Sequence, residues 1–131
     1  MLPCTSGEPE WLPRVLAGLT NLTSLDLSDS LDLRNQHLVD LSLPKLQSLD
    51  LSGTTVSEVA LQCLYTLTQL TRLDLSNCRN CRDCSPLAAL LHIQTLSLSG
   101  CNVRDRDLES LQDLTTLRHL SLNGCRQLTS H

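Results

Sequence analysis

The stretch Leu70-Thr-Arg-Leu73-Asp-Leu75 decides the fold, because the same phrase returns four more times in the 131 residues. The five copies of Leu-x-x-Leu-x-Leu, one of them beginning with Ile, span Leu22–Leu27, Leu46–Leu51, Leu70–Leu75, Ile93–Leu98 and Leu117–Leu122. Successive copies start 24, 24, 23 and 24 residues apart. A chance apolar run would not keep this register through five copies. The pattern therefore predicts a protein built from repeated structural units.

The first half of each repeat has the pattern of a short strand. Leu25 and Leu27 alternate with the polar residues Ser24, Asp26 and Ser28, and this period of two places the leucines on one face. The ninth position of each repeat then carries a small residue. These residues are Ser30, Thr54, Cys78, Cys101 and Cys125.

The second half of the repeat changes to a helical period. Leucines spaced by three form apolar stripes at Leu61, Leu64 and Leu67, and again at Leu108, Leu111 and Leu114. Helix N-caps are predicted at Ser57, at Ser85 before Pro86, and at Asp105. The crossovers at 38–43 and 87–91 are less regular and are predicted to be short helical turns.

A strand and a helix of this size cannot bury their own leucines, so neighbouring units must stack. The repeats resemble leucine-rich repeats. This resemblance implies an α/β solenoid of about five coils, with short parallel strands on the concave face and helices or helical turns on the convex face. It also implies that the ninth-position residue is buried beside the backbone of its neighbours. We expect an irregular N-terminal segment over 1–11 and a repeat domain over 12–131.

Both ends of the repeat domain are expected to be incomplete. Leu12, Val15, Leu16 and Leu19 resemble the helical half of an earlier repeat, and the sequence stops where the fifth repeat should begin its helix. Terminal coils of a solenoid need a polar or capping outer face. Truncation or capping by another chain would explain these ends, and self-association through uncapped coils is a further expectation.

Charge and hydropathy narrow the functional classes. The net charge is −4, and nine of the ten basic residues are Arg. The acidic excess lies in the N-terminal half, so we expect no basic stripe for nucleic acid. We expect neither a membrane span nor a signal peptide, because no apolar run approaches 18 residues. The expected location is cytoplasmic or nuclear.

The seven cysteines and four histidines are not expected to form a metal or catalytic site. Cys78, Cys81 and Cys84 are spaced as C-x-x-C-x-x-C, but zinc would need a fourth ligand, and His92 should lie beyond the intervening helix. We favour Cys78 and Cys81 as small buried groups with free thiols. His119 should face outward while Cys125 faces inward, so no nucleophile and base should meet. We therefore predict a protein that is not an enzyme and has no cofactor.

Binding is predicted on the outward strand positions. The fifth position of the repeat carries Asp26, Asp50, Asp74, Ser97 and Ser121, and nearby positions carry Arg72, Gln94, Arg118 and His119. The stacked carboxylates would attract a basic side chain of a partner. Alternatively, Asp serves only solubility, because like-charge repulsion at a surface is screened by salt. The predicted face contains no aromatic anchor, so affinity from these repeats alone should be weak.

The residues that end three of the strands indicate a subclass. Leu75-Ser-Asn-Cys78, Leu98-Ser-Gly-Cys101 and Leu122-Asn-Gly-Cys125 resemble the cysteine-containing class of leucine-rich repeats, which is found in F-box substrate receptors of cullin ubiquitin ligases. The resemblance implies an adaptor that holds a protein substrate on its concave face. Ser30 and Thr54 depart from the pattern. These 131 residues contain no F-box, so ligase components would bind through regions outside them. The alternative is a leucine-rich scaffold or regulatory protein without ubiquitin chemistry.

Overall fold

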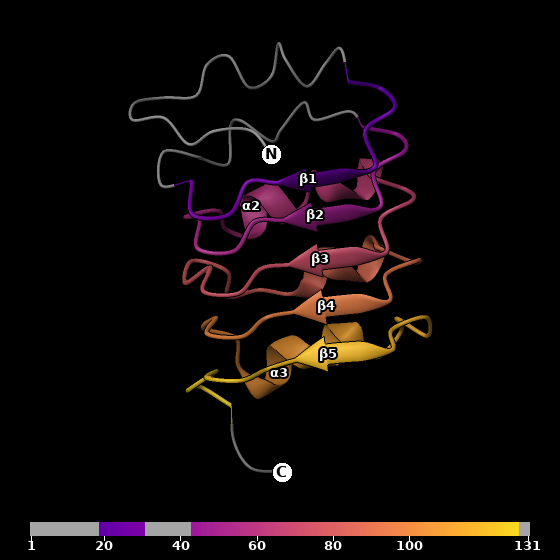
Figure 1. Ribbon diagram of the computed structural model, residues 1–131. Coiled ribbons are helices and arrows are strands. Elements are labelled where there is room, and N and C mark those ends of the chain that lie inside the picture. Colours follow the sequence, from indigo (N-terminus) through magenta and orange to yellow (C-terminus); the bar gives the residue numbers. More distant parts are fainter. Residues whose placement is uncertain (1–18, 31–42, 129–131) are drawn as a thin grey trace.

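The computed structural model describes residues 19–30 and 43–128. Five short strands form one parallel sheet in the order β1-β2-β3-β4-β5, which is also their order in the sequence (Figure 1). The strands are β1 (Ser24–Asp26), β2 (Ser48–Asp50), β3 (Arg72–Asp74), β4 (Thr95–Ser97) and β5 (His119–Ser121). Each strand is the middle of one Leu-x-x-Leu-x-Leu phrase. The prediction of a leucine-rich repeat solenoid with parallel strands is confirmed.

The register of the sheet follows the register of the repeat. Leu49 pairs with Leu25 on one side and with Leu73 on the other. Leu73 in turn pairs with Leu96, so equivalent residues of successive coils lie side by side. These four leucines belong to one continuous core cluster in which nearly every coil contributes its strand leucines. The leucines of the phrase therefore build one shared core.

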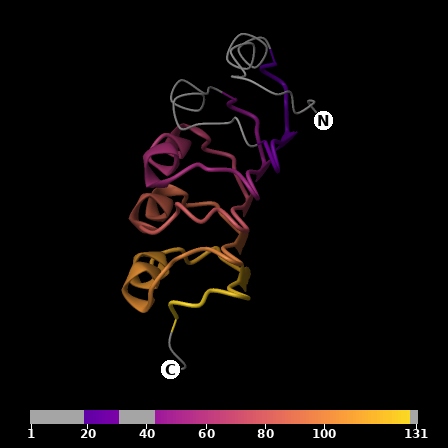
Figure 2. The ribbon, with the colours of Figure 1, turned by 90° about the vertical axis from the view of Figure 1, so that its left-hand side faces the viewer.

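Helical segments cover the side of the core opposite the sheet (Figure 2). They are α2 (Glu58–Leu61), η2 (Leu64–Thr66), η3 (Ser85–Ala89), α3 (Asp105–Leu108) and η4 (Glu109–Leu111), where η marks a 3₁₀-helix. None of them exceeds five residues. The short crossover predicted at 87–91 is confirmed as η3. Within the described ranges, no helix has the length and apolar character needed to cross a membrane.

The predicted helix caps are correct at one of three places. Ser57 caps α2, and its hydroxyl accepts a hydrogen bond from the backbone N–H of Val59. Ser85 is instead the first residue of η3, where its N–H donates to the carboxylate of Asp83. Asp105 likewise lies one residue inside α3.

The start of α3 is stabilised from within the helix. Its N-cap is Arg104, whose backbone N–H donates to the carboxylate of Asp107 at 2.8 Å. The predictions at Ser85 and Asp105 were wrong because a neighbouring Asp satisfies the exposed N–H groups in both turns.

The ninth-position cysteines connect each of the last three described coils to the coil before it. The thiol of Cys101 donates to the carbonyl of Leu75 at 2.9 Å, and the thiol of Cys125 donates to Leu98 at the same distance. Cys78 makes the equivalent bond to Leu51 at 3.0 Å. The expectation that the ninth-position residue is buried against a neighbouring backbone is confirmed at these three cysteines. Thr54 is buried but donates to Leu51 of its own coil, and Ser30 is only half-buried.

The eighth repeat position has a left-handed backbone in every described coil. The residues are Asp29, Gly53, Asn77, Gly100 and Gly124, with φ between 58° and 75°. In the first four of these residues the N–H group donates to the next coil, as when Gly53 donates to Ser76 at 2.8 Å. This conformation favours Gly, Asn and Asp, so the column explains a choice of residues that the strand pattern leaves open.

The described ends of the solenoid are less covered than its middle. Leu120 is 41% exposed, whereas Leu73 and Leu96 at the same repeat position are 1% exposed. Leu19 is also exposed. The predicted segment 1–11, the crossover leucines Leu38 and Leu41, and the N-terminal stripe before Leu19 lie outside the described residues.

Candidate protein-binding face

The predicted aspartates lie at the ends of the first three strands, and each makes the same local bond. One carboxylate oxygen of Asp26 accepts the backbone N–H of Ser28 at 2.9 Å. The equivalent bonds from Ser52 to Asp50 and from Ser76 to Asp74 are also 2.9 Å long. These Asx turns hold the chain as it leaves the strand. Asp at the fifth position therefore has a structural role that neither sequence-based alternative contained.

The charge on Asp26 is favoured by this geometry. Hydrogen bonds from the hydroxyl and then the backbone N–H of Ser28 lower the pKa of its carboxyl below the usual value of 3.8. A carboxylate that accepts two local hydrogen bonds keeps its charge in mildly acidic solution.

Hydroxyl groups continue the column where the aspartates stop. The Ser97 hydroxyl lies 2.6 Å from that of Ser76, and the Ser99 hydroxyl lies 2.7 Å from that of Ser121. Ser97 also donates to Ser99, which connects the two pairs into a chain across three coils. The predicted site residue Ser97 is thus held by its neighbours.

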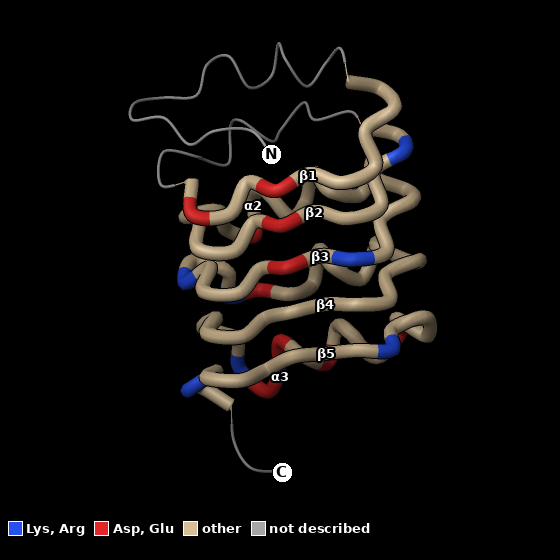
Figure 3. The backbone as a smooth tube through the Cα atoms, viewed as in Figure 1, with Lys and Arg blue, Asp and Glu red and all other residues tan. Residues whose placement is uncertain are grey.

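The other predicted site residues reach outward. Arg72, Gln94, Arg118 and His119 are all exposed, and within the described part of the chain their side chains have no hydrogen-bond or ion-pair partner. Arg72 begins β3, and Arg118 directly precedes β5. Figure 3 shows arginine at the start of β3 and just before β5, and acidic positions on the first three strands. The face combines fixed carboxylates with unpaired cationic side chains.

The cysteine cluster is part of the core. Cys78, Cys81 and Cys84 are buried and reduced, and the Cys81 thiol contacts the carbonyl of Val56 at 3.4 Å. The described residues contain no group of three side chains arranged to hold a metal ion. The interpretation of Cys78 and Cys81 as buried core groups is confirmed.

Burial also makes most of these thiols poor acids. It raises the pKa of Cys84 and of Cys101 to about 12. A hydrogen bond to Cys78, added to burial, raises the pKa of Cys81 and leaves Cys78 as the more acidic member of that pair. Protonated, buried thiols are unreactive.

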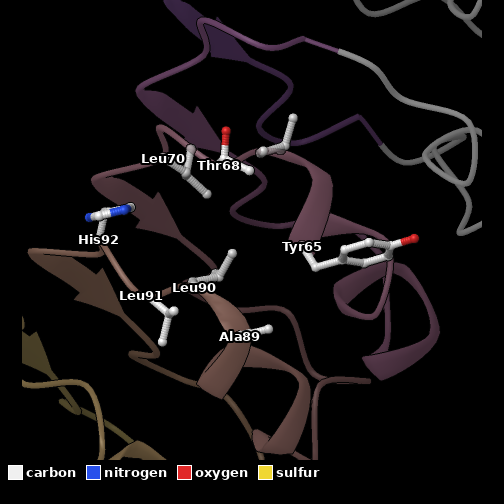
Figure 4. A pocket seen from close by; sticks show the side chains of 8 residues that line it. Tyr65, Thr68, Leu70, Ala89, Leu90, Leu91 and His92 are labelled. Atoms are coloured by element: carbon white, nitrogen blue, oxygen red, sulfur yellow. The ribbon is translucent and has the colours of Figure 1, made fainter.

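One exposed aromatic ring lies away from the strand face. Tyr65 on η2 is 63% exposed, and Leu91 after η3 is 64% exposed. They line a pocket of about 120 Å³ between adjacent coils, with His92 on its rim (Figure 4). Leu91 thus lies outside the core, in keeping with the irregular crossover predicted at 87–91. His92 is exposed.

The binding residues predicted from the sequence did not include those that follow the ninth position of the repeat. Arg79, Asn102 and Arg126 line an open cleft at the edge of the sheet. Each comes directly after a ninth-position cysteine, so the spacing of the repeat contains the signal that would have found them.

Comparisons with known proteins agree with this geometry. Residues 69–90 match a family model described as Leucine Rich Repeat, and residues 89–111 match a second described as Leucine Rich repeat. A search of the curated proteins found no match.

Solved structures extend the similarity to most of the chain. An internalin C2 from Listeria monocytogenes is 29% identical over 85% of this chain and 51% of its own, with a TM-score of 0.67. The mouse RP105/MD-1 complex contains a chain that is 27% identical over 82% of this chain and 18% of its own, with a TM-score of 0.66.

The similarity to the TLR13–ssRNA13 complex supports the fold alone. One chain of that complex is 23% identical over 82% of this chain and 20% of its own, with a TM-score of 0.57. The chain thus spans about half the length of the internalin and a fifth or less of the length of the other two chains. Repeat phrases, sheet register and structural likeness agree that the chain is a leucine-rich repeat solenoid.

Proposed function

We propose that the outward strand face binds a protein partner and that the chain is the substrate-recognition part of an intracellular cullin-type ubiquitin ligase adaptor. The observation that supports binding is the arrangement of five in-register strands whose polar columns point away from the core. Extended faces of this kind are the usual binding surfaces of solenoids. We expect the partner to be a protein, without nucleic acid or membrane, and the location to be cytoplasmic or nuclear.

Charge suggests how such a partner would be held. Asp26, Asp50 and Asp74 form an acidic column whose geometry is fixed before binding, so a basic side chain would meet preorganised carboxylates. Arg72 and Arg118 would meet acidic groups of the same partner. Electrostatic complementarity of this kind directs orientation and association rate more than affinity.

The ligase assignment depends on the cysteine ladder. The bonds from Cys78, Cys101 and Cys125 to the preceding coil give the cysteine-containing phrase a structural basis. The alternative is a leucine-rich scaffold or regulatory protein, and the exposed Tyr65–Leu91 surface favours it because a scaffold would use a second contact surface. Uncapped coils would also permit self-association through Leu120.

A pull-down from cytosol would separate the two functions. The full-length protein is used as bait, with Arg72→Glu/Arg118→Glu as the face variant and Arg106→Glu on α3 as the matched control. Recovery of cullin and its adaptor proteins would support the ligase function. Their absence, with recovery of another stable partner by the wild type and the control, would support the scaffold. Equal recovery by the face variant would contradict binding through the strand face.

A further inference from the structure

We infer that the cleft lined by Arg79, Asn102 and Arg126 binds a phosphoryl group presented by a protein, such as a phosphorylated serine side chain. The cleft measures about 440 Å³ and lies where the chain leaves β3, β4 and β5. This inference is independent of the strand face. The phosphoryl site would function whether or not the concave surface binds a substrate.

The repeat places the two arginines around one centre. Arg79 and Arg126 occupy the same repeat position on the two coils that flank the coil of Asn102. With strands about 4.8 Å apart, their backbones are about 10 Å from each other. Two long guanidinium side chains separated by this distance can approach one small anion from opposite sides.

The charges at the cleft are unbalanced. Both arginines are exposed, and within the described residues neither side chain has an ion-pair partner. The residues that line the cleft include no Asp or Glu. In a chain of net charge −4, a hollow with two cations and no carboxylate is an unusual local environment.

Amide groups complete the lining. Asn77 and Asn123 contribute carboxamide donors from the same rim. Asn102 is fixed because its amide nitrogen donates to the carbonyl of Arg79 at 2.7 Å. Gly100 and Gly124 also line the cleft; the Asn77 side chain covers Gly100, and the absence of a side chain at Gly124 leaves room above its backbone.

The number of donors favours phosphate over carboxylate. A carboxylate has two oxygens and is satisfied by one bidentate arginine, whereas a phosphate monoester offers three terminal oxygens and close to two negative charges. Two guanidinium groups and two amides match the phosphate monoester. A phosphodiester of nucleic acid would carry one charge fewer and use the pair of arginines less well.

Titration of the ¹⁵N-labelled protein, followed by amide chemical shifts, would test this site. The probe is N-acetyl-phosphoserine methylamide, compared with N-acetyl-glutamate methylamide and with a thymidine dinucleotide. We expect saturable shifts at Gly100, Asn102 and Gly124 with the phosphoserine probe. The glutamate probe and the dinucleotide should bind at least about tenfold more weakly, the difference expected from one charge-assisted hydrogen bond.

Three single substitutions localise the effect. Arg79→Gln and Arg126→Gln should each weaken the phosphoserine probe about tenfold, while Arg106→Gln on α3 removes the same charge elsewhere and should change binding less than about twofold. The amide spectrum of each variant verifies that it is folded. Equal losses in all three variants, shifts that do not saturate, or equal affinity for the glutamate or dinucleotide probe would each overturn the inference.

Discussion

Single side chains connect neighbouring coils at the ninth repeat position. In the middle coils a cysteine thiol donates to the preceding coil, as Cys101 does to Leu75. In the second coil the hydroxyl of Thr54 donates to Leu51 within its own coil at 2.7 Å. The position therefore selects a small side chain with one donor, and the preference between sulfur and oxygen is secondary.

Replacement of Cys101 would measure how much the thiol donor contributes to stability. Cys101→Ala removes the thiol from a fully covered position, and the free energy of unfolding should fall by about 1–2 kcal/mol. Cys101→Thr keeps a donor and should cost less. Urea unfolding followed by circular dichroism compares the two variants. A threonine variant less stable than the alanine variant would contradict a role for the donor.

The buried thiols also predict a dependence of stability on pH. The pKa values of Cys84 and Cys101 are raised from 9.0 to about 12 in the folded chain, so the unfolded chain loses these protons first. The contribution of these protonated thiols to the free energy of unfolding is complete below pH 9 and is lost as the pH rises toward 12. For each thiol, the free energy of unfolding falls by about 1.4 kcal/mol per pH unit in this range.

Urea midpoints measured between pH 7 and 10.5 would show the decline. The Cys101→Thr variant has one buried thiol fewer and should have a shallower slope above pH 9. Equal slopes in the variant and the wild type would contradict the raised pKa of Cys101.

At the level of the elements, the repeat phrase predicts strands better than turns. The period of two locates every strand because Leu and polar residues alternate through the phrase. The Asx turns at Asp26, Asp50 and Asp74 were missed, because an exposed aspartate looks the same in the sequence whether it binds a partner or its own backbone. The left-handed backbone at the eighth repeat position was missed because Asp29 and Asn77 occupy two of its five places, so the glycines do not recur in every repeat.

Two glycines at the eighth repeat position allow the cost of backbone strain to be distinguished from the cost of steric crowding. Gly100 and Gly124 have nearly the same φ, +74° and +75°. A methyl group at Gly100 would collide with the side chain of Asn77, whereas one at Gly124 would make ordinary contact with Gly100, 3.8 Å from its nitrogen.

Gly124→Ala should therefore cost about 1–2 kcal/mol from strain alone, and Gly100→Ala should cost more. The double variant Asn77→Gly/Gly100→Ala removes the collision and should recover the excess. Thermal or urea unfolding of these variants provides the comparison. Equal destabilisation by the two single substitutions would contradict the predicted crowding.

For the whole molecule, the sequence predicts the architecture and leaves the binding face partly undetermined. The spacing of the leucines is sufficient to predict stacking because no single coil buries its own leucines. Arg72, Arg118 and His119 were predicted to face outward, and they do. The cleft at Arg79 and Arg126 was missed because it exists only when three coils are side by side.

A solenoid predicts that the cost of a core substitution depends on the neighbouring coils. Leu73 has a coil on each side and is 1% exposed, whereas Leu120 is 41% exposed at the same repeat position. Leu73→Ala should reduce the free energy of unfolding by about 3 kcal/mol and Leu120→Ala by about 1 kcal/mol. Urea denaturation measures both values. Similar losses at the two sites would show that the coils do not share one core.

The most direct test of the account detects the hydrogen bonds between coils. Scalar couplings across hydrogen bonds, measured by nuclear magnetic resonance, should join the amide of Leu51 to the carbonyl of Asp74 and the amide of Leu75 to that of Ser97, bonds of 2.9 Å in both cases. Such couplings, repeated from coil to coil, would establish the parallel in-register stack that turns the polar columns outward. Protected amides coupled in another register, or only within a coil, would contradict it.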